Sequence, residues 1–393
     1  MVVRNARVVT AGHDYGMADI VVEGDKIAAV EKATARPVGA DDIDGTGLIA
    51  LPGFVDIHSH GRGGHDFCDA TDEAFAAIAR GKAQDGVTSF LATGLTRPEA
   101  DLARLCECAA RYRAAADKRL PSLLGVHLEG PFFNLSMAGA QNPDYLKKPD
   151  IAMVDRLRRL APILKVSYAP ELDEGTEPDF PFTRALVERG IVGSLGHSAA
   201  DYAVFEGARV AGATHLTHFC NAMMPVHHLR PSMVTGGLTA DDVYAEIITD
   251  GVHLSDPMIR LILRCKGPDR LMIITDAMCA AGEPDGIYSL GGLRVKVERG
   301  RATLADVPYD PKAVVSNVAG SVALFPQCFK RYVAATALPL SEAVKAAGFN
   351  QLRSLGIADR GELLPGQIAD VVLVNAGLDP VATIVNGQLA WRG

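Results

Sequence analysis

Eight short apolar segments alternate with helical or loop segments through the middle of the chain, and this alternation constrains the fold most strongly. The segments are residues 54–57, 88–92, 123–127, 163–169, 191–195, 215–217, 243–249 and 272–275. Strands that alternate with helices form parallel sheets. Eight such units over about 300 residues predict a (β/α)8 TIM barrel of the α/β class. A doubly wound sheet is the weaker alternative, because no glycine-rich dinucleotide turn follows an early strand.

Two of the intervening segments carry helix-boundary signals. Thr71 precedes two acidic residues and a glycine follows the segment, which predicts a helix over residues 72–85. Ser198, with Asp201 three positions later, predicts a capping-box start for a helix that ends at Gly212.

Both ends of the chain are β-type instead. Strand-like runs broken by turns fill residues 1–50, and two further runs lie at residues 371–374 and 382–385. Since the two ends flank the barrel, we expect them to pair into one small accessory β-sandwich domain. The predicted division is residues 1–52 and 359–393 for the accessory domain and 53–358 for the catalytic barrel.

Composition narrows the classes of partner. Hydrophobic residues make up 48% of the chain and charged residues 22%, as in an ordinary globular protein with a sizeable core. The 39 Lys and Arg residues face 47 Asp and Glu residues, and no basic run occurs, so neither a nucleic-acid nor a membrane partner is expected. Arg4 and Arg7 interrupt the apolar start, unlike a signal peptide, and seven cysteines without a repeated spacing are typical of reduced thiols. Both features predict a cytoplasmic protein.

Side chains of metal-ligating types follow six of the predicted strands: His58 and His60, Glu129, His197, His218, His253 and Asp276. Active sites of (β/α)8 barrels are built at the C-terminal rim, so we expect these side chains to meet there. Imidazoles with carboxylates are ligands of Zn²⁺, the predicted ion, with iron as the alternative. His58 and His60 lie two residues apart on an extended strand and face the same side. His127 is interpreted as an ordinary hydrogen-bonded structural histidine.

Longer motifs surround these residues. They are LPGFVDIHSHG at residues 51–61, HLEGPF at 127–132, GHS at 196–198, THFCNAM at 217–223, DGVH at 250–253, TDA at 275–277, AGS at 319–321 and LPGQIADVV at 364–372. Together they span nearly the whole chain and resemble the amidohydrolase superfamily and, within it, the N-acetylglucosamine-6-phosphate deacetylases. HLEGP together with the THxxNAM pattern is highly specific, whereas His-x-His alone is only moderately so.

The resemblance implies that Glu129, His197 and His218 hold one metal ion. It also implies that His58 and His60, completed by Glu129 and Asp276, can hold a second, so one or two ions are expected per subunit. The implied activity is metal-dependent hydrolysis of the acetamide of an N-acetylated amino sugar, which releases acetate and the free amine. Asp276 is the predicted catalytic residue, because the leaving amine must receive a proton. The substrate contacts expected are Ala140, Gln141, Asn221, Ala222, His228, Arg230, His253, Ala319, Gly320 and Ser321, and the expected assembly is a homodimer.

Two positions depart from the family pattern. Gln141 stands where the family has His, and Leu229 stands where it has Arg. Both family side chains lie at the phosphate end of the substrate, and Leu supplies no donor for a phosphate. Two changes at one subsite therefore predict a different substituent at that end of the sugar, although Arg230 and two histidines are close by in the sequence. A deacetylase of an unphosphorylated N-acetylhexosamine is the resulting alternative.

Two other classes compete with this interpretation. An aminoacylase or cyclic-amide hydrolase often bridges two metals with a modified lysine on the fourth strand, and Lys165 is on that strand. Lys165 lies before the strand's end, however, and Glu129 can serve as the bridge. A non-catalytic barrel used as a scaffold is the other class, and it is disfavoured because no ligand or base is missing.

Overall fold

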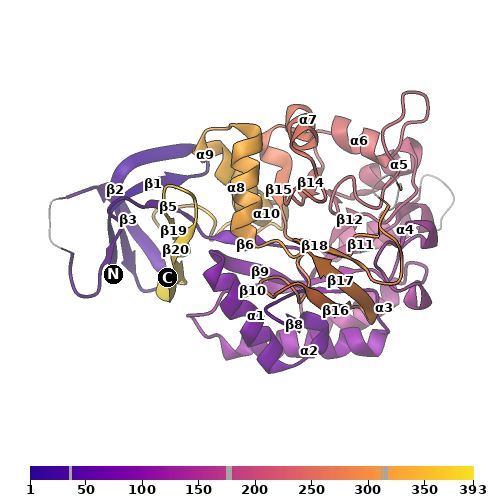
Figure 1. Cartoon of the computed structure of the whole chain (residues 1–393), viewed down its shortest axis with the longest axis horizontal. Helices are drawn as coiled ribbons and strands as arrows, with labels where there is room; N and C mark the ends of the chain where they lie inside the picture. Colours follow the sequence, from indigo (N-terminus) through magenta and orange to yellow (C-terminus); the bar gives the residue numbers. More distant parts are fainter. Residues whose placement is uncertain (35–37, 174–178, 311–312, 314–316) are drawn as a thin grey trace.

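The predicted barrel forms the larger part of the computed structural model, which describes residues 1–34, 38–173, 179–310, 313 and 317–393. Its eight parallel strands lie in one sheet in the order in which they occur in the chain (Figure 1). They are β6 (Phe54–Asp56), β9 (Val87–Gly94), β10 (Ser122–Glu129), β11 (Ile163–Tyr168), β12 (Val192–Leu195), β13 (His215–Leu216), β14 (Tyr244–Ile247) and β15 (Leu271–Ile273). Each predicted segment overlaps one strand, so the predicted fold class is confirmed.

The strands are apolar on both faces because both faces are covered. Alternate side chains point into the barrel or towards the helices around it. Val55, Leu91 and Met272 pack in a cluster inside the barrel, whereas Phe54 and Phe90 belong to the larger cluster beneath the helices. Near-continuous apolar runs are therefore what this architecture requires.

The barrel is closed by residues that follow its first and last strands. The sheet path ends at β6 and β15. Beyond them, the Asp276 amide donates to the His58 carbonyl at 2.9 Å, and the His60 amide donates to the Ala277 carbonyl at 2.8 Å. Asp56 adds a side-chain link, because its Oδ2 accepts a 2.7 Å hydrogen bond from the Thr275 hydroxyl. The two segments that close the barrel are therefore the same two that carry His58, His60 and Asp276.

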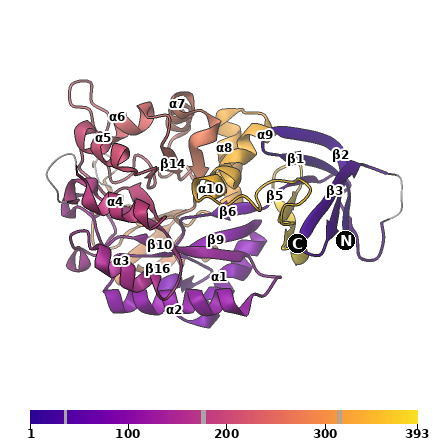
Figure 2. The ribbon, with the colours of Figure 1, turned by 180° about the vertical axis from the view of Figure 1, so that it is seen from behind.

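Helices pack around the barrel (Figure 2). They are α1 (Asp72–Gln84), α2 (Glu99–Ala115), α3 (Ile151–Arg158), α4 (Pro181–Glu188), α5 (Tyr202–Ala211), α6 (Met233–Thr239), α7 (Asp256–Lys266), α8 (Phe325–Thr336), α9 (Leu340–Ala343) and α10 (Phe349–Ser354). Among the described residues, no helix is long and apolar enough to cross a membrane.

One predicted helix start was right and the other was wrong. Thr71 caps α1 by accepting from the Ala74 amide at 3.2 Å. The cap of α5 is Asp201, which accepts from Val204, and not Ser198. The Ser198 hydroxyl instead donates to Glu171 at 2.6 Å, because the segment between β12 and α5 first turns across the barrel rim.

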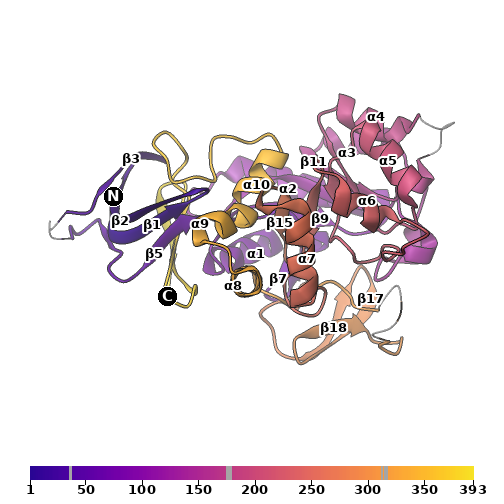
Figure 3. The ribbon, with the colours of Figure 1, turned by 90° about the horizontal axis from the view of Figure 1, so that it is seen from above.

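Both ends of the chain meet in a mixed sheet at one end of the molecule (Figures 1 and 3). The sheet runs β21 (Gln388–Arg392), β20 (Pro380–Val385), β19 (Val371–Val374), β5 (Ile49–Pro52), β1 (Val2–Thr10), β2 (His13–Glu23) and β3 (Lys26–Lys32), with β4 (Ile43–Asp44) beside β1. The register pairs Val371 with Pro52, which ties the last segment to the first. An isolated bridge between Lys26 and Ile368 brings the β3 edge back towards β19. The boundaries at residues 52 and 359 stay a prediction.

A small antiparallel sheet follows β15 and was not predicted from the sequence. It consists of β16 (Gly286–Leu290), β17 (Leu293–Glu298) and β18 (Arg301–Leu304), and Figure 3 shows it projecting from the barrel near α7. Its Leu290 and Val295 pack on Leu95 and Met278, so the sheet is anchored beside the barrel rim. Two-residue strands β7 (Gly61–Arg62) and β8 (His65–Asp66) form a hairpin after β6.

The closing carboxylate generates a prediction about stability. Asp56 is buried and pairs with Lys82 at 2.9 Å while it bonds Thr275. Asp56→Ala should lower the free energy of unfolding by about 3–5 kcal/mol, because it leaves a buried ammonium uncompensated. Urea unfolding of the chelated chain measures this change. Asp14→Ala, which breaks an exposed pair with Arg7, is the control and should have far less effect; an equal loss in both variants would contradict the prediction.

Candidate metal centre

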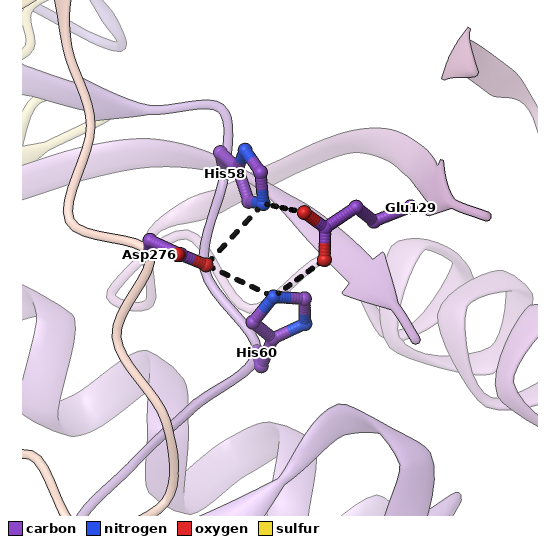
Figure 4. Close-up of side chains that lie close together, drawn as sticks. All are labelled: His58, His60, Glu129 and Asp276. Atoms are coloured by element: carbon purple, nitrogen blue, oxygen red, sulfur yellow. Dashed lines mark ion pairs between the residues drawn. The ribbon is translucent and has the colours of Figure 1, made fainter. Parts of the chain in front are cut away.

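Four ligand-type side chains from three barrel strands converge at the C-terminal rim (Figure 4). His58 and His60 follow β6, Glu129 ends β10, and Asp276 follows β15. His58 Nε2 lies 3.3 Å from Glu129 Oε1 and 3.4 Å from Asp276 Oδ1. His60 Nε2 lies 3.1 Å from Glu129 Oε2 and 3.1 Å from Asp276 Oδ1. We call these four residues the first cluster.

A second cluster shares Glu129 with the first. It adds His197, which follows β12, and His218, which follows β13. Glu129 Oε1 lies 3.2 Å from His218 Nε2 and 3.5 Å from His197 Nε2, and these two nitrogens are 3.0 Å apart. The six residues predicted as metal ligands therefore do come together, and one carboxylate joins the two groups.

The donor set and its electrostatics fit a divalent cation. His58 Nε2 is buried and, among the described residues, has no hydrogen-bond partner, although two carboxylates face it. Burial alone would lower the pKa of His58, but Glu129, Asp276 and Glu246 outweigh it and raise the pKa to about 9. Carboxylates that attract a proton this strongly also attract a cation. A buried set of imidazoles and carboxylates of this kind fits a divalent metal ion.

The carboxylates themselves stay ionised. Burial would raise the pKa of Glu129, but the histidines around it hold that pKa well below its usual range. Burial acts in the same direction on Asp276, and His58 and His60 lower its pKa in the same way. Both groups are therefore negative at neutral pH, as metal ligands or proton acceptors must be.

Three of these ligand residues have left-handed backbone conformations. The φ angles are 48° at His197, 28° at His218 and 51° at Asp276, values that are uncommon for residues other than glycine. Hydrogen bonds hold the turns in place: the Phe219 amide donates to the Glu246 carbonyl at 2.7 Å, and the Ser321 amide donates to the Asp276 carbonyl at 2.7 Å. Backbone strain of this kind is common where a site imposes its geometry on the chain.

Glu246 on β14 is a site residue that the sequence analysis missed. It is fully buried, and its Oε2 accepts a hydrogen bond from His58 Nδ1 at 2.9 Å. Its Oε1 pairs with Lys165 Nζ. Burial would raise the pKa of Glu246, but Lys165 and His58 lower it to about 2. A glutamate inside an otherwise apolar strand was the signal that could have identified it.

His127 has the structural role expected of it. Its Nε2 lies 2.8 Å from the Ser167 hydroxyl and its Nδ1 lies 3.3 Å from the Thr93 hydroxyl. The ring packs edge-on against His58, with centroids 4.6 Å apart, and so limits how His58 can turn.

A cavity of about 240 Å³ opens directly onto both clusters. Six of the predicted substrate contacts line it: Ala140, Gln141, Asn221, Ala222, His253 and Gly320. His253 is oriented by Asp250, whose Oδ2 lies 2.8 Å from His253 Nδ1. The lining also includes residues that the sequence analysis did not name, among them Leu95, Cys220, Val252, Leu290 and Tyr309.

The other predicted contacts lie outside the cavity lining. His228 and Arg230 are exposed on the segment between β13 and α6. Ala319 and Ser321 are buried behind Asp276, where the Ser321 hydroxyl donates to the Thr275 carbonyl at 2.5 Å. Only Gly320, between them, reaches the cavity, because the chain turns there with a φ of 56°.

Within one chain, Gln141 and Leu229 lie in different places, whereas the sequence-based interpretation puts them at one subsite. Gln141 Nε2 donates to Glu129 Oε2 at 2.7 Å, and its Oε1 accepts from the Thr96 amide at 2.9 Å. Leu229 is 77% exposed and does not line the cavity. The change at position 141 therefore belongs to the surroundings of the first cluster, and the two departures are separate changes.

Comparisons with known proteins agree with this geometry. The profile of the amidohydrolase family matches residues 49–390. The chain is 34% identical over 393 residues to N-acetylglucosamine-6-phosphate deacetylase of Lysinibacillus sphaericus, covering 99% of this chain and 97% of that one. It is 33% identical over 371 residues to N-acetylgalactosamine-6-phosphate deacetylase of Escherichia coli O157:H7, covering 93% and 92%. A mutant N-acetyl-D-glucosamine-6-phosphate deacetylase from Mycobacterium smegmatis, in complex with N-acetyl-D-glucosamine-6-phosphate, matches with a TM-score of 0.89 and 32% identity over 99% of each chain.

The shared carboxylate predicts unequal effects of ligand substitutions on metal content. Glu129→Gln should weaken divalent-metal binding by more than the roughly 100-fold typical of outer-shell changes, because Glu129 serves both clusters. His60→Ala should weaken binding at the first cluster only, because His60 does not belong to the second. Metal per chain, measured by mass spectrometry after reconstitution, checks this; a Glu129→Gln chain that retains more metal than His60→Ala would contradict it.

Proposed function

The chain belongs to the amidohydrolase family, and from that premise we propose that it hydrolyses the acetamide of an N-acetylated amino sugar, releasing acetate and the free amine. The proposal rests on the arrangement of side chains at the C-terminal rim of the barrel. Two ligand clusters share Glu129, and Asp276 lies in the wall of a cavity that opens onto both. Relatives over 30% identical along nearly the whole chain are amino-sugar-phosphate deacetylases.

Zn²⁺ is the proposed ion, one in each cluster, because each cluster has two imidazoles with one or two carboxylates, which are typical zinc ligands. A bound divalent ion supplies Lewis acidity, which makes water more acidic and polarises a carbonyl group. The buried histidine and carboxylate side chains of the two clusters would hold such an ion, and the barrel strands position these side chains.

Asp276 is the proposed proton carrier. Its carboxylate is ionised and faces the cavity, so it can accept a proton from water during attack on the amide carbon. The C–N bond then breaks, and Asp276 returns the proton to the nitrogen, which leaves as an amine. His253, held by Asp250, is the proposed contact to the acetamide, and Asn221 and Ala222, which also line the cavity, are the proposed contacts to the sugar.

Two candidate substrates differ in whether they carry a phosphate group. N-acetylglucosamine 6-phosphate is the first, because the relatives act on hexosamine 6-phosphates and Gln141 no longer argues against it. An unphosphorylated N-acetylhexosamine is the second. It is favoured by the cavity wall, which contains neither Lys nor Arg among the described residues.

The competing amidohydrolase classes receive less support. Lys165 would be the modified bridging lysine of a cyclic-amide hydrolase, but its side chain is fully buried and pairs with Glu246. A scaffold without catalysis has no need of an ionised carboxylate beside two histidine clusters. The homodimer and the cytoplasmic location stay predictions.

Replacing the proposed proton carrier tests the mechanism. Asp276→Asn should lower kcat by about 10²–10⁴-fold, because an amide cannot shuttle a proton. The Glu129, His197 and His218 ligands are unchanged, so metal at the second cluster should be retained. Steady-state deacetylation with metal analysis measures both. Asp144→Asn, at an exposed carboxylate, is the control and should keep wild-type activity. Wild-type turnover by Asp276→Asn would show that Asp276 is not the proton carrier.

A substrate screen tests the function and its phosphate end. Acetate release should occur with N-acetylglucosamine or N-acetylgalactosamine, with or without 6-phosphate, and should be lost after chelation. A kcat/KM that is at least about 100-fold higher with the phosphate selects the first candidate, since charge-assisted contacts contribute about 1.5–3 kcal/mol each. Equal values select the second. No release from any N-acetylhexosamine by the metal-loaded chain would refute the proposed function.

A further inference from the structure

The buried pair of Lys165 and Glu246 lies behind the first cluster and has no place in the proposed proton transfer. Lys165 is on β11 and Glu246 on β14, and both side chains are fully buried inside the barrel. The Glu246 carboxylate uses one oxygen for Lys165 and the other for His58 Nδ1, at 2.9 Å. Each of these two buried charges is therefore stabilised by the opposite charge on the other residue.

This arrangement sets which ring nitrogen of His58 carries hydrogen. An ionised carboxylate only accepts hydrogen bonds, so His58 Nδ1 must donate. In the neutral ring, Nε2 then carries the lone pair, and this is the nitrogen that faces Glu129 and Asp276 at 3.3 and 3.4 Å. Partners of this kind orient metal-binding histidines and raise their basicity.

The same carboxylate acts differently on the second cluster. Its Oε2 lies 3.3 Å from the backbone amide of His218, but not against the imidazole. His197, the other histidine there, donates from Nδ1 to the Met137 carbonyl at 2.8 Å. Glu246 therefore controls a ring tautomer in the first cluster only.

We propose that Lys165 and Glu246 are positioning residues for the first cluster. Lys165 keeps Glu246 oriented as an acceptor, Glu246 keeps His58 in the Nδ1–H tautomer, and His58 can then bind a divalent ion through Nε2. The inference rests on the metal dependence in the proposed function but not on the identity of the sugar.

Glu246→Gln gives a sharp test because an amide has two different ends. The Lys165 ammonium can only donate, so it takes the amide oxygen and turns the NH2 group towards His58. His58 Nδ1 must then accept, hydrogen moves to Nε2, and the lone pair facing the cluster is lost. In Lys165→Met/Glu246→Gln the amide is free to turn its oxygen towards His58, which restores the original tautomer.

Metal titration of the chelated chain, with Zn²⁺ as the probe, should show two ions bound by the wild type. Glu246→Gln should bind one of them about 10–100-fold more weakly and leave the other unchanged. The double variant should regain most of the lost affinity, a rescue that a merely structural role would not produce. Asp173→Asn, at a buried carboxylate that accepts from Phe182 and Thr183, is the matched control and should lower stability without changing metal affinity.

Nitrogen NMR of the His58 ring in the chelated wild type, recorded above pH 9 where the ring is neutral, checks the tautomer without any variant and should find hydrogen on Nδ1. Hydrogen on Nε2 alone would overturn the inference, as would two ions bound with wild-type affinity by Glu246→Gln, or a double variant weaker than the single one. Failure of the wild type to bind Zn²⁺ would instead count against the proposed metal dependence.

Discussion

The carboxylate of Glu129 is the group on which the rest of the site depends. It is 2% exposed, and one of its oxygens faces three histidines while the other faces His60 and Gln141. An ionised carboxylate that has lost its water must be surrounded by donors or cations. Segments after three other barrel strands supply the histidines, and Gln141 lies in the segment that follows β10 itself, so these groups come from several parts of the chain.

Other buried charges in the barrel follow the same rule. Asp56 is paired with Lys82 where the barrel closes, and Glu246 is paired with Lys165 behind His58. Each pair joins elements that are far apart in the sequence, so the charges contribute to specifying which elements meet. The ligands therefore rest on, or directly follow, packed strands, whereas several of the cavity's other walls belong to connecting segments. Rigid support of this kind suits a centre that requires accurate ligand positions.

Much of this arrangement could be predicted from the sequence because its signals are local. Apolar runs of three to seven residues located the strands, and the motifs around His58, Glu129 and His218 located ligands at their ends. Predictions failed where the outcome depended on distant partners. Ser198 has a capping-box spacing but bonds Glu171, and Gln141 is far in sequence from Thr96, whose amide orients it towards Glu129.

The sequence by itself determined the barrel, the ligand types and the family, since periodicity and short motifs are properties of neighbouring residues. Only the tertiary structure decided that Glu129 is shared by two clusters, that Gln141 and Leu229 belong to different places, and that Glu246 stands behind His58. These facts arise from contacts between residues 12 to 188 positions apart. Burial makes such contacts strong, because a charge removed from water must be matched by whatever the fold brings beside it.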